Sequence, residues 1–126
     1  MTGDVIPEVV RQLITDRIDS IPELEAILLL RQYRTRLWSV EDAGKRLYVS
    51  PTVAAHVVGI LTERGFFARI DEHYQYAPNS PELEAAVDLL AVTYSEHLIA
   101  VTNFIHAKPS ASVRLFAQAF RLRKDK

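Results

Sequence analysis

Apolar residues recur at helical spacing in several separate stretches of the chain, and serine-containing motifs stand at the start of most of these stretches. Residues 6–18 carry apolar side chains three or four positions apart, which predicts an amphipathic helix. Three further helix starts follow, each with a serine suited to the N-cap position: Ser20-Ile21-Pro22-Glu23, Ser39-Val40-Glu41-Asp42 and Ser50-Pro51. We expect the corresponding helices to end near Arg34, Leu47 and Arg64.

The period of the pattern changes after Gly65, which suits the left-handed exit of a helix. Residues 66–70 and 74–76 predict two short strands around a polar tip, Asp71-Glu72-His73. From Pro81 to His106 the chain has no internal proline or glycine, and this predicts one long helix. Residues 112–121 predict a last short helix that is amphipathic and basic.

Three helices, a two-stranded hairpin and further helix form the element order of a winged helix. The local sequence agrees, because the small pair Ala43-Gly44 permits close approach of two helices and Ser50 caps the second of them. The stretch from Ser39 to Pro78 resembles the winged helix-turn-helix of bacterial transcription regulators, including the MarR-like group. We therefore expect a mostly α fold with a small β-hairpin, a winged helix-turn-helix with long C-terminal helices.

The resemblance implies that the helix from Pro51 faces the major groove of duplex DNA, with Ser50, Thr52 and His56 nearest the bases. Basic residues on and around the motif are then candidates for phosphate contacts: Lys45, Arg46, Arg64 and Arg69. The sequence also departs from the family pattern. Val53, Ala55, Gly59 and Ile60 stand where arginine, lysine, serine or glutamine are common, Tyr48 stands where glycine is usual, and the wing tip carries two acids.

The predicted long helix carries two apolar stripes. One can cover the winged-helix part, and the other is left for a partner: Leu89, Val92 and Ile99. These residues predict a homodimer, whose two-fold symmetry also suits palindromic DNA sites. We expect residues 1–80 to form the winged-helix domain with the N-terminal helices. Residues 81–126 then form the dimerisation part, a long helix plus a short basic amphipathic helix.

Composition narrows the range of functions. Apolar residues make up 48% of the 126 residues and charged residues 25%, which is ordinary for one globular domain. The absence of cysteine excludes disulfides and thiolate metal sites, and no two of the four histidines have metal-ligand spacing. We therefore expect no metal, no cofactor and no enzymatic activity. The chain opens without a signal-peptide pattern and has no apolar run long enough for a membrane span, which favours a cytoplasmic protein.

Charge neither supports nor excludes a nucleic-acid partner. The net charge is −1, but residues 108–126 hold six basic residues and one acidic residue. The first hypothesis is a DNA-binding transcription regulator that acts as a homodimer on double-stranded DNA. The alternative keeps the fold and makes the helix from Pro51 a protein-docking surface, so that the chain is an adaptor. A third hypothesis is a regulator with a ligand pocket between the long helix and the wing.

Overall fold

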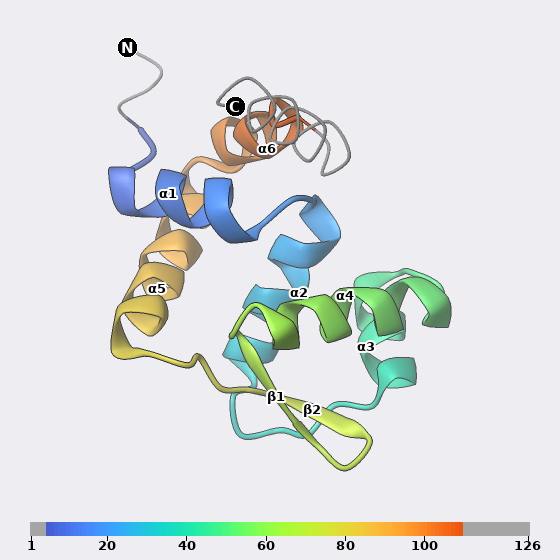
Figure 1. Cartoon of the computed structure of the whole chain (residues 1–126). Helices are drawn as coiled ribbons and strands as arrows, with labels where there is room; N and C mark the ends of the chain where they lie inside the picture. The colour runs from blue at the N-terminus through green and yellow to red at the C-terminus, as the bar shows by residue number, and fades with distance from the viewer. Residues whose placement is uncertain (1–4, 110–126) are drawn as a thin grey trace, which may run out of the picture.

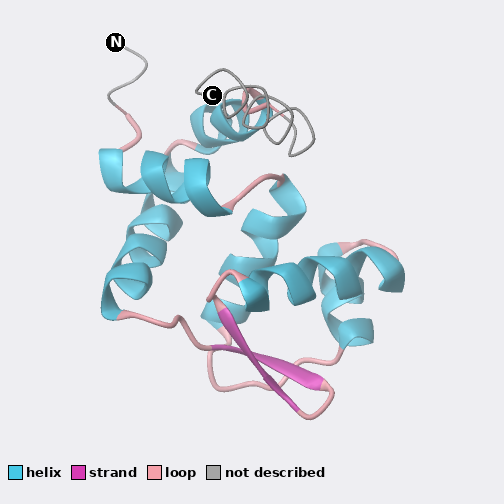
Figure 2. Cartoon of the chain, viewed as in Figure 1, coloured by secondary structure: helices cyan, strands magenta, loops and turns pink. Residues whose placement is uncertain are grey.

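The computed structural model describes residues 5–109, which form six helices and one antiparallel hairpin (Figures 1 and 2). The elements follow the order α1 (Glu8–Arg17), α2 (Ile21–Gln32), α3 (Val40–Leu47), α4 (Pro51–Glu63), β1 (Phe67–Ile70), β2 (His73–Tyr76), α5 (Pro81–Glu96) and α6 (Leu98–His106). The predicted fold class is confirmed. The predicted short helix over residues 112–121 lies outside the described residues.

Serine side chains fix the starts of four helices. The Oγ atoms of Ser20, Ser39, Ser50 and Ser80 accept hydrogen bonds from the backbone N–H three residues further on, at 3.0 to 3.3 Å. Each bond satisfies one of the amide groups that the first turn of a helix leaves free. The three helix starts predicted from the sequence are thus confirmed, and their positions are encoded locally.

The helices α2, α3 and α4 and the hairpin form a winged helix. In the hairpin, Phe67 pairs with Tyr76 and Ile70 pairs with His73. Trp38, which precedes α3, extends this sheet as an isolated bridge, because it exchanges two backbone hydrogen bonds of 2.8 Å with Tyr74. The wing is therefore tied directly to the start of the helix-turn-helix.

A single hydrophobic core runs from the winged helix to a terminal layer made of α1, α5 and α6. In this layer α1 and α6 lie at the end of the molecule opposite the hairpin, and α5 runs from the hairpin side towards that end (Figure 1). Trp38, Leu61 and Phe66 are fully buried on the winged-helix side, and Ile14 and Leu90 are fully buried in the terminal layer. Because both parts contribute to one core, the terminal layer and the winged helix stabilise each other.

The predicted long helix over 81–106 is wrong in one respect, because it breaks at His97. The backbone there leaves helical geometry, with φ −136° and ψ 53°, and α5 and α6 meet at a bend of 113°. The hydroxyls of Thr93 and Ser95 donate to the carbonyls of Leu89 and Val92 just before the break, a competition for backbone groups that bends helices. The bend lets α6 bury Val101 and Ile105, whereas a straight helix would carry them away from the core.

Within the described part of the chain, no single helix is long and apolar enough to cross a membrane. Only α5 and α6 taken together reach that length and composition, and the bend at His97 separates them.

Candidate nucleic-acid interface

The helix-turn-helix is formed by α3 and α4, which pack closely at Gly44. A Cβ atom at Gly44 would lie 3.1 Å from the Val49 carbonyl oxygen and 3.3 Å from the Ala54 Cβ, so a larger residue would push the helices apart. The turn itself passes through Tyr48, whose backbone is left-handed with φ 58°. Its side chain is 94% exposed, so the turn presents an aromatic ring to solvent.

One face of α4 is buried and the other is open. Ala54, Val57, Val58 and Leu61 are buried against the rest of the winged helix. The side chains predicted to face DNA lie on the exposed face: Pro51, Thr52, Val53, Ala55 and His56. Ser50 is also exposed, but its Oγ already accepts the capping hydrogen bond from Val53. From Pro51 to Thr62 the helix contains no Asp, Glu, Lys or Arg, so the exposed face of its first turns is uncharged.

Two basic residues of α3, Lys45 and Arg46, are exposed, and α3 packs against α4. The Arg46 guanidinium lies over the rings of Tyr33 and Trp38, with its Cζ 5.0 and 5.6 Å from the two centroids, and Nη2 donates to the Tyr33 hydroxyl at 3.1 Å. These contacts hold Arg46 in one orientation, with part of its surface free.

The sequence reasoning missed a third cation at this place, Arg36. Its Cζ lies 3.8 Å from the centroid of the Trp38 ring, and its Nη2 forms an ion pair of 3.3 Å with Asp42. Arg34 and Arg36 lie between the aromatic residues Tyr33 and Trp38, and this clustering was the available signal. Arg36, Lys45 and Arg46 are named the α3 cations below.

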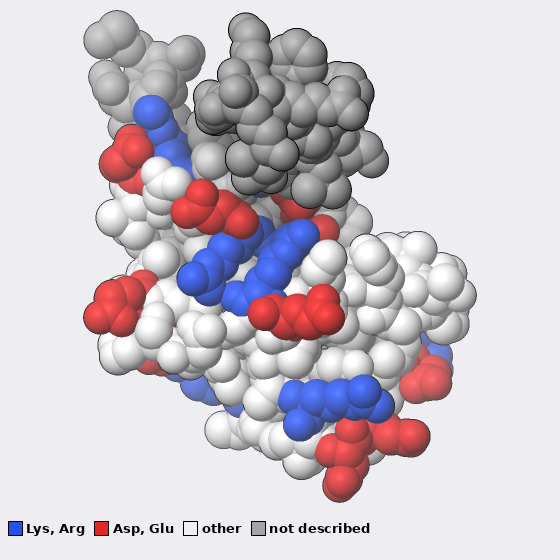
Figure 3. Space-filling model, in the orientation of Figure 1, with Lys and Arg blue, Asp and Glu red and all other residues white. Residues whose placement is uncertain are grey.

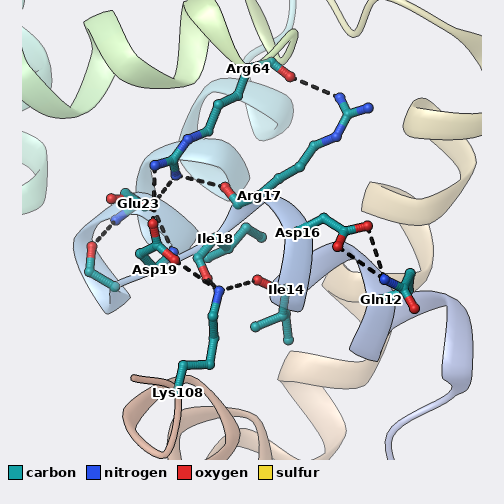
Figure 4. A network of polar contacts seen from close by, with 10 residues as sticks. Gln12, Ile14, Asp16, Arg17, Ile18, Asp19, Glu23, Arg64 and Lys108 are labelled. Carbon is teal, nitrogen blue, oxygen red and sulfur yellow. Dashed lines mark hydrogen bonds and ion pairs between the residues drawn. The ribbon is translucent and has the colours of Figure 1, made fainter. Parts of the chain in front are cut away.

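Arg64 does not join the α3 cations, although the sequence placed it among the phosphate contacts. Its guanidinium donates to Glu23 Oε1 and the Arg17 carbonyl, both at 2.8 Å, and to Asp19 Oδ2 at 3.1 Å (Figure 4). Arg17 in turn donates to the Arg64 carbonyl at 2.8 Å. The guanidinium is bound to carboxylates of the chain itself, so Arg64 joins the end of α4 to the α1–α2 connection. It is therefore not a candidate for a phosphate contact.

The wing brings Arg69 close to His56 of α4. Both residues line a groove of about 420 Å³ between α4 and the hairpin, together with Gly59 and Tyr74. Arg69 lies over the Tyr74 ring, and its Nε donates to the Asp71 carbonyl at 3.0 Å. On the face shown in Figure 3, acidic and basic side chains are interspersed rather than grouped by sign. The exposed acids Asp71 and Glu72 lie at the tip of the wing.

The residues predicted for the dimer interface are exposed on the terminal layer. Leu89 is 36% exposed, Val92 51% and Ile99 72%, and Leu98 beside the helix break is 53% exposed. An apolar groove of about 1030 Å³ lies where α5 meets α6, and its lining includes Leu98 and Ile99 together with Val5, Ile6 and Phe104. It lies at the end of α5 far from the hairpin, whereas the third hypothesis placed a pocket between the long helix and the wing (Figure 1).

Comparison with known proteins gives structural neighbours only. No protein-family model and no curated protein matches the sequence. A MarR family protein of Mycobacterium tuberculosis, solved in complex with DNA, superposes with a TM-score of 0.51 at 17% identity, over 95% of this chain and 89% of that one. A MarR family protein from Bacillus stearothermophilus gives a TM-score of 0.50 at 12% identity, over 92% of this chain and 80% of that one.

This chain has the winged-helix fold of the MarR family proteins. The resemblance stated from Ser39 to Pro78 is thereby confirmed as a fold, and it extends beyond that stretch to the terminal layer. In this MarR-like fold, Lys45 and Arg46 lie on α3, Arg36 lies in the loop before α3, and the uncharged face lies on α4. Among residues 5–109, no three His, Asp or Glu side chains are grouped so as to hold a metal ion.

Proposed function

We propose that this chain is a cytoplasmic, non-enzymatic transcription regulator that binds double-stranded DNA as a homodimer. The observation that carries the proposal is the exposed, uncharged face of α4 together with the exposed cations on α3 and in the loop before it. An uncharged helix face fits between the walls of a major groove, and cations at its border meet the phosphates of those walls. A MarR family neighbour was solved in complex with DNA, which supports the same partner here.

In the proposed complex, α4 enters the major groove by its first turns. Lys45, Arg46 and Arg36 then contact phosphates on one wall, and Arg69 of the wing contacts the backbone on the other side of His56. Thr52 and His56 lie nearest the bases, and Ser50 acts mainly as the cap that aims the first turn of α4.

The homodimer is proposed from the exposed apolar side chains of the terminal layer. Leu98 and Ile99 line an apolar groove, Leu89 and Val92 are exposed on the preceding helix, and exposed apolar side chains of this kind are typical of an interaction site. A two-fold interface there leaves both copies of α4 free at the opposite end of the molecule, as binding to two half-sites requires.

A second candidate function keeps the fold without DNA. The acidic wing tip and the apolar Val53 favour a protein partner for α4, because Asp71 and Glu72 repel phosphates. In that case the chain is an adaptor, and Val53→Asp disrupts a protein complex while the fold persists.

The experiment that separates the two candidates measures the affinity for duplex DNA as a function of salt. Each phosphate contact contributes about 0.9 to the slope of log K against log salt, so Lys45→Ala with Arg46→Ala flattens the slope by about 1.8 and weakens binding to all sequences. The control is Arg11→Ala, which removes a positive charge from α1, including its surface ion pair with Glu8. A protein that fails to retard duplex DNA even at low salt is the adaptor instead.

A further inference from the structure

The exposed face of α4 is unusual in offering methyl groups and few hydrogen-bonding atoms. Thr52, Val53 and Ala55 are exposed there, and the Val53 side chain is 42% exposed although it is apolar. The polar atoms on this part of the face are the Thr52 hydroxyl and the His56 ring, and Gly59 in the following turn contributes no side chain. A helix with this surface has almost nothing that distinguishes guanine from adenine by hydrogen bonding.

The methyl groups of Thr52, Val53 and Ala55, named the methyl patch below, span the exposed face of α4: at about 100° per residue, Val53 lies on one side of Thr52 and Ala55 on the other. Thr52 and Ala55 are three residues apart, as are Val53 and His56, so both pairs are neighbours on the helix surface. Residues three apart are displaced by about 4.5 Å along the helix, at about 1.5 Å per residue. Successive base pairs are about 3.4 Å apart, so the patch covers two or three of them.

The major groove displays one apolar group, the C5-methyl of thymine, and the known partners of that group are small apolar side chains such as Ala and the Thr methyl. We propose that α4 recognises thymine methyl groups, so that each half-site contains thymines that face Thr52 and Ala55 on one side of the helix and Val53 on the other. This inference rests on the proposed function, and it specifies what that function leaves open, the kind of sequence that is bound.

The positions of the charges give the elements different roles in DNA binding. The α3 cations and Arg69 lie outside the methyl patch, so they contact phosphates and supply affinity without sequence preference. Preference among sequences then comes from the patch, with His56 at its border toward the groove shared with Arg69. Removing methyl groups from the DNA therefore changes affinity and leaves the salt dependence unchanged.

The test exchanges thymine for deoxyuridine, which removes only the C5-methyl. The full-length protein first selects duplexes from a random pool. Each thymine of the selected half-sites is then replaced in turn, with replaced thymines outside the half-sites as controls. Removing one thymine methyl group from a buried contact weakens binding to the duplex about fourfold. Two such replacements together weaken it about fifteenfold, while replacements outside the half-sites change nothing.

Two variants assign the methyl groups to residues. Val53→Ala and Thr52→Ser remove methyl groups from the protein at exposed positions and add no charge, and alanine is a good helix former, so α4 is retained. For the thymine that Val53 contacts, the fourfold penalty of deoxyuridine shrinks towards none in Val53→Ala and persists in Thr52→Ser. Non-additive effects of the Val53→Ala and deoxyuridine substitutions indicate direct contact between the two groups, whereas a general loss of affinity would leave the effects additive.

Duplexes with deoxyuridine that bind as tightly as their thymine counterparts, with the salt slope of the unmodified protein, overturn methyl recognition and leave DNA binding intact. Selection that enriches guanine and cytosine opposite α4 overturns it as well. Failure of every duplex to bind at low salt overturns the proposed function itself, so the two failures are distinguishable.

Discussion

Tyr48 combines a bulky side chain with a backbone conformation that favours glycine. With φ 58° and ψ 42° it lies in the left-handed region, which costs an L-residue about 1–2 kcal/mol. The Tyr48 side chain makes no hydrogen bond or ring contact with another described residue that would offset this cost, since the residue is 94% exposed. Strain of this kind is common where a surface serves a partner.

We therefore expect Tyr48→Gly to raise the free energy of unfolding by about 0.5–1 kcal/mol, because the relief of strain exceeds the extra flexibility of glycine in the unfolded chain. Urea denaturation measures the change. Tyr48→Ala is the matched control, since it removes the ring but keeps the Cβ atom and hence the strain. A loss of stability in Tyr48→Gly equal to that in Tyr48→Ala would mean that the ring itself stabilises the fold.

Tyr76 carries a buried hydroxyl that has no hydrogen-bond partner within residues 5–109. Burial, reinforced by the charge of Asp88, raises the pKa of this phenol to about 12. Because the folded pKa exceeds the ordinary value of 10.0, the folded state favours the protonated form. The protonated phenol thus contributes stability that is fully present below about pH 10 and is lost as the pH rises towards about 12.

Tyr76→Phe removes both the unpaired hydroxyl and the titration. We expect the variant to be more stable than the parent by about 1 kcal/mol at neutral pH, since a desolvated polar group disappears. Its advantage grows between pH 10 and 12, where only the parent must keep this phenol from ionising. Thermal unfolding of both proteins across that range checks the prediction, and an advantage that shrinks with pH would contradict it.

At the scale of elements, the sequence predicts what is determined locally and misses what depends on distant partners. The starts of α2, α3 and α4 follow from serine caps whose donors lie three residues away. The end of α5 does not follow from a local signal, because threonine and serine with such backbone hydrogen bonds also occur inside unbroken helices. The packing of α6 on the core favours the bend.

The same distinction explains the interface. Lys45 and Arg46 are found from their place on α3, just before the turn. Arg64 has a similar local setting, but its carboxylate partners Asp19 and Glu23 lie 45 and 41 residues earlier, and no local pattern indicates that pairing. The orientation of the methyl patch was likewise accessible from helical spacing once the fold was known.

Lys108 ties the end of α6 to α1. Its ammonium donates to the carbonyls of Ile14 and Ile18 at 2.5 and 2.6 Å and forms an ion pair of 2.9 Å with Asp19 (Figure 4). Only 9% of the Lys108 side chain is exposed, so these bonds are shielded from water. The contact links two elements that lie at opposite ends of the described chain.

Lys108→Met keeps the length of the side chain and removes its charge. We expect it to lower the free energy of unfolding by about 2 kcal/mol, the usual contribution of hydrogen bonds from a charged donor. Hydrogen exchange of the α1 amides measures the local effect, and His106→Ala, at the exposed last position of α6, is the control. Unchanged protection of α1 in Lys108→Met would show that apolar packing alone holds the two elements together.

For the whole molecule, the decisive measurement is the mass in solution. A homodimer through the terminal layer has about twice the 14.3 kDa of one chain. Val92→Glu or Leu89→Glu places an unpaired charge in that interface and dissociates it, because burying the charge costs more than separation. Light scattering reports the mass. Ile70→Glu, at a 43% exposed apolar residue of the wing, is the matched control and leaves the mass unchanged.

The packing of α1 against α5 and α6 also sets an order of events during synthesis. The winged helix from Ser20 to Tyr76 is continuous in the chain, so its contacts close short loops and form early. The helix α1, by contrast, packs against elements near the end of the described chain, and Lys108 reaches Ile14 across 94 residues. Until those elements leave the ribosome, Val10, Leu13 and Ile14 remain uncovered, and the nascent chain is most prone to aggregation in that interval.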